Sequence, residues 1–486
     1  MDRMTCPLRQ AAREYGDLPA LIRPDGTVSY TWLDRFVDAV AYRLRTRGVE
    51  YGEPVAMICP MRWEYPVLLW ALFRLQSMVC PISPRFPMET VSAILQNTGC
   101  RAIIDPARGF VSHTPLPGLR RIPLDGLFEN LAMERGGLED EAHVPDPELA
   151  GTIILTSGSL GLPKAVVHSL SSHYFSALGS NTNIRVVPGS RWLLSLPLYH
   201  VGGLSIIFRT ILGGGVMVIP PSGKSLGEAL ESLRITHLSL VATQLYRLLK
   251  EMTDMQAGRR LAAVLVGGGP TGADLVAGAY DRGIPVHTTY GLTEMGSQVT
   301  TTGPNEERSR LVTSGKVLDY RQVRIDDGEI LVKGKTLFKG YLTPDGLSLP
   351  LDEDGWFRSG DLGEMDDEGY LTLLGRKDNM FISGGENLYP EEIEARIQRL
   401  PGVVQAVVVP VEDEEFGFRP VAFVQSQGGE TMNHDDMAGY LAEVLPRFKI
   451  PVAFFDWPGA GGGGLKPDRA YLARLARKRL GKKGGL

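Results

Sequence analysis

One nine-residue segment is dense in groups that could bind phosphate: Thr156-Ser157-Gly158-Ser159-Leu160-Gly161-Leu162-Pro163-Lys164. It follows the apolar run Gly151–Leu155, which predicts a strand that enters a loop. Glycines let backbone N–H groups approach an anion closely, and Lys164 adds a positive charge. The segment therefore suits a polyphosphate, although a Ser/Gly surface turn is the alternative. It differs from the common phosphate loop of small NTPases, since it lacks the second glycine and the hydroxyl residue after the lysine.

Five further polar segments follow predicted strands: Pro197–Gly203, Gly267–Pro270, Thr289–Glu294, Trp356–Leu362, and Gly375-Arg376 with Ser383–Asn387. Ligands of such sheets bind outside the carboxyl ends of the strands. Tyr290 offers a ring face for a base, and Glu294 offers a hard oxygen ligand for Mg²⁺. Asp361, expected in a turn, could bond a ribose diol. Each segment alone could be an ordinary turn, but their order and spacing make chance improbable.

Short apolar strands alternate with helical patterns in the first half of the chain. Thr31–Arg47 predicts an amphipathic helix, because its apolar residues recur on one face. The other predicted helices are Tyr65–Gln76, Met88–Gln96, Leu204–Ile211 and Ser225–Leu233. The predicted strands are Pro54–Cys59, Val79–Ile82, Arg101–Ile104, Trp192–Leu196, Val216–Ile219, His237–Val241, Ala262–Val266 and Val286–Thr289. This βαβ rhythm indicates parallel strands with helical crossovers.

The pattern changes from about Gly315. Short strands with Asp-Gly and Glu-Gly turns indicate antiparallel hairpins, at Val323–Ile325, Glu329–Lys333 and Leu371–Leu374. A polar joint, Gly375–Asn379, precedes a small α+β unit that includes a helix beginning at Pro390. We therefore expect an α/β protein with two domains. Residues 1–377 would form a large domain of βαβ-built sheets with a small antiparallel β-barrel-like part, and residues 378–486 a small mobile α+β domain.

Composition narrows the class of protein. The 486 residues are 43% hydrophobic and 22% charged, as in a soluble globular protein. The net charge of −5 gives no global positive field for nucleic acid. The four cysteines form no C-x-x-C pair, so reduced buried thiols are expected. The start of the chain lacks the apolar core of a signal peptide, and Tyr65–Leu75 is too short to span a bilayer. We expect a cytoplasmic protein and consider a homodimer as its assembly.

Taken in order, the six segments resemble the adenylate-forming superfamily of acyl-CoA synthetases, nearly end to end from Tyr30–Leu33 to Lys466. Within that superfamily four stretches are most similar to the o-succinylbenzoate–CoA ligases of menaquinone biosynthesis: Leu196–Leu204, Tyr290–Glu294 with Ser297-Gln298, Pro163–His168 and Gly463–Arg469. The resemblance implies that a carboxylate attacks the α-phosphate of ATP, after which the C-terminal domain rotates and the CoA thiol attacks the acyl-AMP. An aryl or medium-chain acid, a carrier-protein acceptor, and a degenerate nucleotide-binding relative remain alternatives.

The resemblance also implies roles for individual residues. Lys466, on a glycine-rich loop, would bridge carboxylate and α-phosphate, and Glu294 with Thr156 would hold Mg²⁺. Asp361 and Arg376 would hold the ribose, and the Gly268–Pro270 loop would frame adenine. The residues implied in ATP or AMP binding are Thr156, Ser157, Gly158, Ser159, Gly161, Lys164, Gly268, Gly269, Pro270, Thr289, Tyr290, Gly291, Thr293, Asp361, Arg376 and Lys466.

His200 would orient the acyl carbonyl or assist the thiol. The implied catalytic residues are Lys466, His200, Glu294 and Lys164, and the implied acyl-site residues are His200, Gly202, Arg209, Gly291, Ser297 and Gln298. Arg209 would bind the second carboxylate of o-succinylbenzoate, and a surface helix charge is its alternative. Gly384 and Gly385 would line the passage for the pantetheine chain of CoA.

Two further positions bear on the rotation of the C-terminal domain and on the affinity for ATP. Asp378 matches the position of the family's hinge, at which an element end absorbs a large rotation. Leu160 stands where relatives usually carry Ser or Thr, so a hydroxyl that could contact phosphate is missing. We expect weaker ATP binding or an impaired loop as the consequence.

Overall fold

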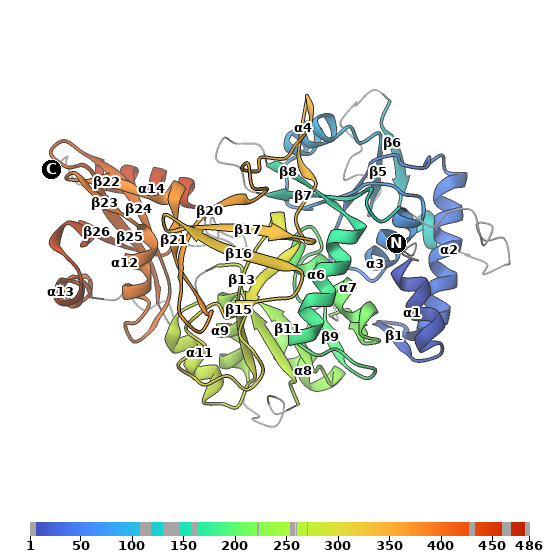
Figure 1. Ribbon diagram of the computed structural model, residues 1–486, viewed down its shortest axis with the longest axis horizontal. Helices are drawn as coiled ribbons and strands as arrows, with labels where there is room; N and C mark the ends of the chain where they lie inside the picture. The colour runs from blue at the N-terminus through green and yellow to red at the C-terminus, as the bar shows by residue number, and fades with distance from the viewer. Residues whose placement is uncertain are drawn as a thin grey trace.

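The computed structural model describes residues 6–106, 118–129, 146–156, 163–220, 223–252, 258, 260–269, 271–426, 433–458 and 468–481. Two large sheets with helices packed against them make up most of the chain, and a four-stranded sheet lies between them and a small C-terminal unit (Figure 1). The expected α/β class, with a large N-terminal part and a small C-terminal part, is confirmed.

The first large sheet contains the strand that enters the predicted phosphate loop. Its order is β19 (Gly346–Ser348), β18 (Gly340–Thr343), β8 (Lys164–Ser169), β7 (Ala150–Thr156), β4 (Val79–Ile82), β3 (Val55–Ile58), β5 (Ala102–Asp105) and β6 (Arg120–Pro123). The inner strands β7, β4, β3 and β5 run parallel, as the βαβ rhythm predicts. β7 and β8 are antiparallel and pair Thr156 with Lys164, so these two residues face each other where the loop leaves the sheet.

The second large sheet carries the predicted acyl and adenine segments. Its order is β15 (Lys316–Val317), β14 (Ser297–Thr301), β13 (Val286–Leu292), β12 (Ala263–Val266), β11 (His237–Leu240), β9 (Arg191–Leu193), β10 (Val216–Val218), β1 (Pro19–Arg23) and β2 (Gly26–Ser29). The strands from β13 to β1 are parallel to their neighbours, whereas β14 returns antiparallel to β13.

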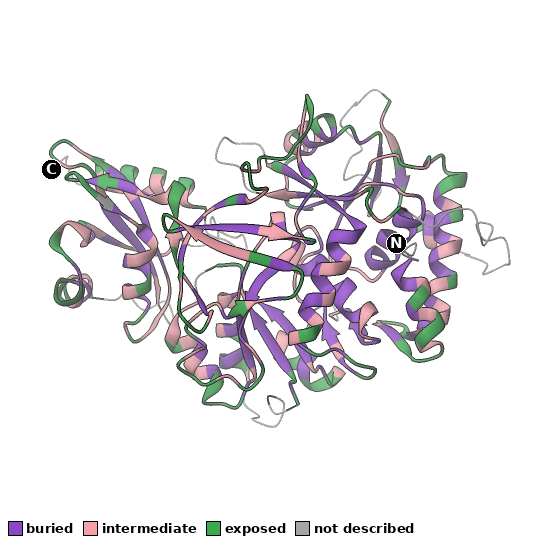
Figure 2. Cartoon of the chain, in the orientation of Figure 1, coloured by how far each residue is buried: buried purple, intermediate pink, exposed green. Residues whose placement is uncertain are grey.

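The helices of this part bury apolar faces against the sheets. They are α1 (Pro7–Tyr15), α2 (Tyr30–Thr46), α3 (Glu64–Arg74), α4 (Met88–Thr98), α5 (Asp125–Phe128), α6 (Leu170–Asn183), α7 (Val201–Leu212), α8 (Leu226–Leu233), α9 (Ala242–Glu251) and α11 (Ala273–Tyr280). α2 begins where the Ser29 side chain accepts the Trp32 N–H, and it buries the apolar stripe that its sequence predicts. α3 is buried along its whole length, and Figure 2 shows the purple interior that these helices share with the strands.

The antiparallel hairpins form a four-stranded sheet in the order β16 (Arg321–Asp326), β17 (Glu329–Gly334), β20 (Phe357–Met365) and β21 (Leu371–Arg376). The hairpins are therefore confirmed, but the barrel-like shape expected for them is not. The C-terminal strands are β23 (Glu386–Leu388), β22 (Phe381–Ser383), β25 (Gly417–Ser426) and β24 (Val403–Asp413), with β26 (Ala453–Asp456) parallel to β25.

Helices α12 (Pro390–Ile397), α13 (His434–Val444) and α14 (Arg469–Gly481) pack on the C-terminal sheet. The apolar clusters beneath them contain only residues from Phe381 onward, so this unit has a core of its own. Short 3₁₀ turns cover Thr293–Met295, Lys377–Asn379 and Arg447–Lys449. All four cysteines are buried and free, as expected. Within the described residues, no helix combines the length and the apolar character that a membrane span requires.

Two sequence expectations about loops were wrong. Tyr290, Gly291 and Leu292 lie within strand β13, which was expected to end at Thr289 and continues because β14 pairs with its last residues. Asp361 lies within strand β20 rather than in a turn, although Gly360 before it has a φ of 72° and the register with β21 shifts just after it. Cross-strand pairing with distant segments thus converted both expected loops into strands.

Candidate active site

A buried carboxylate connects the second large sheet with the four-stranded sheet. The Tyr290 hydroxyl donates to Asp361 Oδ2 at 2.8 Å, and Arg376 Nη1 donates to Asp361 Oδ1 at 2.8 Å. Asp361 and Arg376 are direct cross-strand partners on β20 and β21. A charged donor on one oxygen and a phenol on the other fix the carboxylate in one orientation. The structure therefore brings together three residues that the sequence assigned to one nucleotide site.

The electrostatics of these three residues are coupled. Burial opposes the charge on Arg376, but Asp361 and Asp378 favour it more strongly and raise the pKa of the guanidinium. Burial and the Asp361 charge raise the pKa of Tyr290, so its hydroxyl remains a donor at neutral pH. Arg376 Nη2 also lies 3.6 Å from Asp378 Oδ2, at the predicted hinge.

A second group gathers at the base of the phosphate loop. Tyr341, on β18 beside β8, donates to Glu294 Oε1 at 2.7 Å. Lys164 Nζ lies 5.3 Å from the centre of the Tyr341 ring. Thr156 is the strand partner of Lys164. Tyr341 thus contacts the carboxylate and lies near the cation that were both expected at the phosphates.

These donors fit a magnesium ion that also binds phosphate. A carboxylate offers about four lone-pair positions, and Tyr341 occupies one of them on Glu294. Mg²⁺ in such sites uses one or two carboxylates and completes its shell with water and phosphate oxygens. The described residues contain no group of three or more His, Cys, Asp or Glu placed to hold a metal alone.

Arg209 is the most unusual residue of the predicted acyl site. It lies on α7 with 0% of its surface exposed, so the alternative of a surface helix charge is excluded. Nη2 donates to Ser297 Oγ at 3.1 Å, whereas Nε and Nη1 are buried without a hydrogen-bond partner in the described part of the chain. Burial, and the charge of Arg321 after it, lower the pKa of Arg209 to about 9, so the side chain is still cationic at neutral pH. A buried cation with unused donors is costly unless an anion joins it.

The neighbours of Arg209 on β14 differ in what they can offer. Ser297 has a φ of 122°, an uncommon value that turns its backbone at the strand start. Gln298 is buried, and its amide is already bonded to Ser180 and Thr301, at 2.7 and 2.6 Å. A side chain at Gly291 would come within 2.2 Å of Ser297 O, so close packing with β14 also requires this glycine. Ser297 therefore hydrogen-bonds to Arg209, whereas the amide of Gln298 is used in bonds to other side chains of the protein.

His200 precedes helix α7, which begins at Val201 and not at Leu204 as the sequence suggested. It is exposed, and its ring lies 4.7 Å from that of Tyr199. The protein itself packs closely around Gly202 and Gly203, the two glycines that follow His200 and Val201. A Cβ on Gly203 would lie 2.2 Å from Pro197 O, and one on Gly202 would lie 3.3 Å from the Leu196 side chain.

The remaining glycines differ in their surroundings. Gly268 has a φ of 84°, and the space at Gly269 is open to 4 Å, which leaves room beside the adenine segment. Gly384 and Gly385 form the turn between β22 and β23, where a Cβ on Gly384 would lie 2.9 Å from the Phe416 ring.

The other predicted site residues are two threonines and the hinge residue. The hydroxyl of Thr289 donates to Thr300 O at 2.6 Å, and Thr293 O accepts from buried His168 Nε2 at 2.7 Å. The side chain of Asp378 is 81% exposed.

Several predicted site residues lie outside the described residues: Ser157, Gly158, Ser159, Leu160, Gly161, Pro270 and Lys466. Tyr341 and His168 are residues of the site that sequence reasoning did not assign. An aromatic hydroxyl after Lys339-Gly340 is a weak signal by itself. Only the pairing of β18 with β8 places Tyr341 beside Glu294.

The fold and this site define an α/β protein of two units, with a preorganised acidic and basic cluster of the kind that binds a nucleotide with its metal. The chain belongs to the family of AMP-binding enzymes. The model of the AMP-binding enzyme family matches residues 8–342, and that of the AMP-binding enzyme C-terminal domain matches residues 392–456.

Individual relatives narrow the comparison. The 2-succinylbenzoate–CoA ligase of Salmonella typhimurium is 34% identical over 473 residues, which cover 96% of each chain. The solved o-succinylbenzoate CoA synthetase of Bacillus subtilis, in complex with the acyl-adenylate intermediate OSB-AMP, is 29% identical. It has a TM-score of 0.85 and matches over 96% of this chain and 98% of its own. The same synthetase with ATP and magnesium ion has a TM-score of 0.83 at 29% identity, covering 93% and 96%.

Proposed function

We propose that this protein is an AMP-forming acid–CoA ligase that activates o-succinylbenzoate with ATP and Mg²⁺ and transfers the acyl group to CoA. Arg209 supports the choice of acid, because it is a fully buried cation with two nitrogens that have no partner among the described residues, and an anion would satisfy them. o-Succinylbenzoate has two carboxylates, so one can be activated while the other neutralises Arg209. The relatives named above act on this acid, which agrees with the proposal.

In the first half-reaction, a carboxylate oxygen attacks the α-phosphorus and pyrophosphate leaves. Attack of one anion on another needs positive charge where negative charge accumulates. Lys164 and Lys466 would supply that charge, and Asp361 with Arg376 would hold the ribose. Thr156 and Glu294 would hold Mg²⁺, which neutralises phosphate charge. Tyr341 keeps Glu294 in place for this role.

In the second half-reaction, the CoA sulfur attacks the acyl carbonyl and AMP leaves. We propose that the C-terminal unit, residues 378–486, rotates on residues 1–377 at Asp378 between the two steps. The exposure of Asp378 and the separate core of that unit agree with such a hinge. Lys466 would then leave the site, Gly384 and Gly385 would line the path of the pantetheine chain, and His200 would face the acyl group.

Acid-dependent exchange of pyrophosphate into ATP, measured over a panel of carboxylic acids, tests this function. o-Succinylbenzoate should support the fastest exchange, and CoA should then yield the thioester. Faster exchange with benzoate or a medium-chain acid would replace the substrate assignment. A carrier protein that outperforms CoA as acceptor would replace the second half-reaction.

Assembly and location complete the proposal. We propose a homodimer, which light-scattering mass measurement tests directly, and a cytoplasmic location. Four free buried cysteines agree with a reducing compartment.

A further inference from the structure

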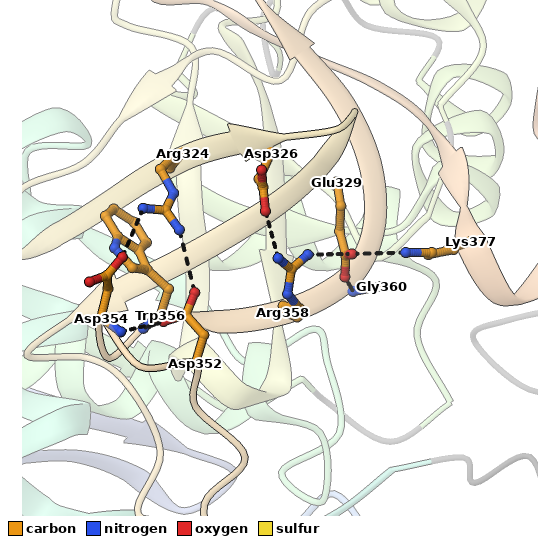
Figure 3. Close-up of polar contacts among 9 residues, drawn as sticks. All are labelled: Arg324, Asp326, Glu329, Asp352, Asp354, Trp356, Arg358, Gly360 and Lys377. Carbon is orange, nitrogen blue, oxygen red and sulfur yellow. Dashed lines mark hydrogen bonds and ion pairs between the residues drawn. The ribbon is translucent and has the colours of Figure 1, made fainter.

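A second buried carboxylate lies beside the Asp361 strand. Glu329 is the first residue of β17, and its side chain is 6% exposed. Oε1 accepts the backbone N–H of Gly360 at 3.2 Å, while Oε2 accepts Arg358 Nη1 at 3.1 Å and Lys377 Nζ at 3.2 Å. Figure 3 shows Lys377 and Arg358 approaching this carboxylate from opposite sides.

The three donors adjoin the functional residues in sequence. Gly360 directly precedes Asp361, and Lys377 lies between Arg376 and Asp378. Glu329 therefore bonds to a neighbour of each partner of the Asp361–Arg376 pair. Burial opposes its charge, yet the hydrogen bonds from Lys377, Gly360 and Arg358 prevail and lower the pKa of the carboxyl. Glu329 is thus ionised at neutral pH, and its charge holds two cations.

The other ion pairs in Figure 3 lie on the surface of the same sheet and are a useful contrast. Arg324 stacks on Trp356 and reaches Asp352 at 3.4 Å and Asp354 at 3.7 Å. The side chain of Asp354 is 74% exposed, so such pairs contribute little to stability. These Arg324 ion pairs involve neither the Asp361–Arg376 pair nor Asp378. Glu329, in contrast, bonds to Gly360 and Lys377, which adjoin those residues in the sequence.

We infer that Glu329 is a positioning residue that fixes the Gly360–Asp361 backbone for the ribose and anchors Lys377 on the fixed side of the hinge. This inference rests on the proposed two-step function for its hinge part. With Lys377 held by the large unit, rotation is confined to the residues that follow it. The Glu329 carboxylate thereby affects both the affinity for the nucleotide and the rotation of the C-terminal unit.

Glu329→Gln tests the ribose part, because the variant keeps the size of the side chain but replaces the charged acceptor of the Gly360 N–H by a neutral one. AMP binding to the purified variant, measured by calorimetry, should weaken about tenfold, as expected when a charge-assisted hydrogen bond that positions the Asp361 backbone becomes a neutral one. Circular dichroism would confirm that the variant is folded. A dissociation constant within about twofold of the parent value, in folded protein, would overturn the ribose part.

Lys377→Met tests the hinge part and still decides it if Glu329→Gln does not fold. Thioester formation from supplied acyl-AMP should slow about tenfold, more than the ATP–pyrophosphate exchange of the same variant. Lys333→Met is the matched control, since Lys333 lies on β17 but donates to Asp354 O at 2.8 Å. Equal changes in both half-reactions would overturn the hinge part.

Different results would contradict the proposed ligase function and the proposed role of Glu329. If the parent protein does not exchange pyrophosphate with o-succinylbenzoate, the proposed substrate is wrong. The AMP-binding comparison of Glu329→Gln with the parent protein remains decisive in that case, because it needs no acid and no CoA.

Discussion

The Tyr290 hydroxyl donates a 2.8 Å hydrogen bond to the carboxylate of Asp361, although 71 positions separate the two residues in the chain. Tyr290 lies in the antiparallel pairing of β13 with β14 in the second large sheet, and Asp361 lies on the four-stranded sheet. Arg376 completes the pair of donors from the neighbouring strand. The carboxylate is therefore oriented before any nucleotide arrives, which reduces the cost of ordering it on binding.

Asp361→Asn should raise the KM for ATP about 10- to 100-fold, because a buried charged hydrogen bond contributes about 1.5–3 kcal/mol. Steady-state pyrophosphate exchange measures this effect. Asp366→Asn is the control, since Asp366 pairs with Arg310 on the surface of the same sheet at 2.9 Å. Similar KM values in both variants would remove Asp361 from the nucleotide site.

Arg209→Met should weaken o-succinylbenzoate by about 2–5 kcal/mol, the range for removing one partner of a buried charge pair. Benzoate, which has no second carboxylate, should be affected much less. Inhibition constants for the two acids against pyrophosphate exchange give the comparison. Equal losses would show that Arg209 supports the fold of the site and does not recognise the second carboxylate.

Acid should destabilise the protein through its buried histidines. Burial lowers the pKa of His168 and of His237 to about 4, below the unfolded value of about 6.5. The unfolded chain therefore binds more protons between these values, and the free energy of unfolding falls as pH drops from about 6.5 to about 4.

The loss should reach up to about 3 kcal/mol for each histidine. Urea unfolding at about pH 7 and about pH 5 measures the first part of this loss, about 2 kcal/mol for each histidine. His168→Gln should show a smaller difference between the two pH values than the parent protein. A parent stability that does not change over this interval would contradict the prediction.

Lys466→Ala should abolish adenylation but preserve thioester formation from supplied acyl-AMP, because the lysine is needed only while negative charge develops at the α-phosphate. The two half-reactions are assayed separately on one preparation. A loss of both activities in folded protein would argue against a lysine that acts in the first step only.

Leu160→Thr should lower the KM for ATP by restoring a hydroxyl to the phosphate loop. A charge-assisted hydrogen bond to phosphate corresponds to about a tenfold change. Leu160→Val is the matched control, since it is similar in shape to threonine but adds no donor. An unchanged KM in the threonine variant would show that the loop does not need this hydroxyl.

The sequence by itself determined the elements and the inventory of the site. Apolar periodicity located α2, and the prolines Pro84 and Pro87 that follow β4 helped to locate it at its observed bounds, because these signals are local. The order of polar segments indicated the family, and that resemblance implied site roles for Asp361, Arg376, Glu294 and Arg209. Polar and charged residues that follow apolar strands can be recognised from the sequence alone, before their spatial neighbours are known.

Only the tertiary structure decided how these residues meet. Pairing with β14 extended β13 beyond Thr289, and pairing with β18 placed Tyr341 beside Glu294. Burial of Arg209 and Glu329 depends on segments far away in the chain, so no local pattern could separate them from surface charges. Contacts between strands that are distant in the chain set the register of the sheets and the burial of each side chain. Sequence periodicity shows only which face of a strand or helix is apolar and can be buried.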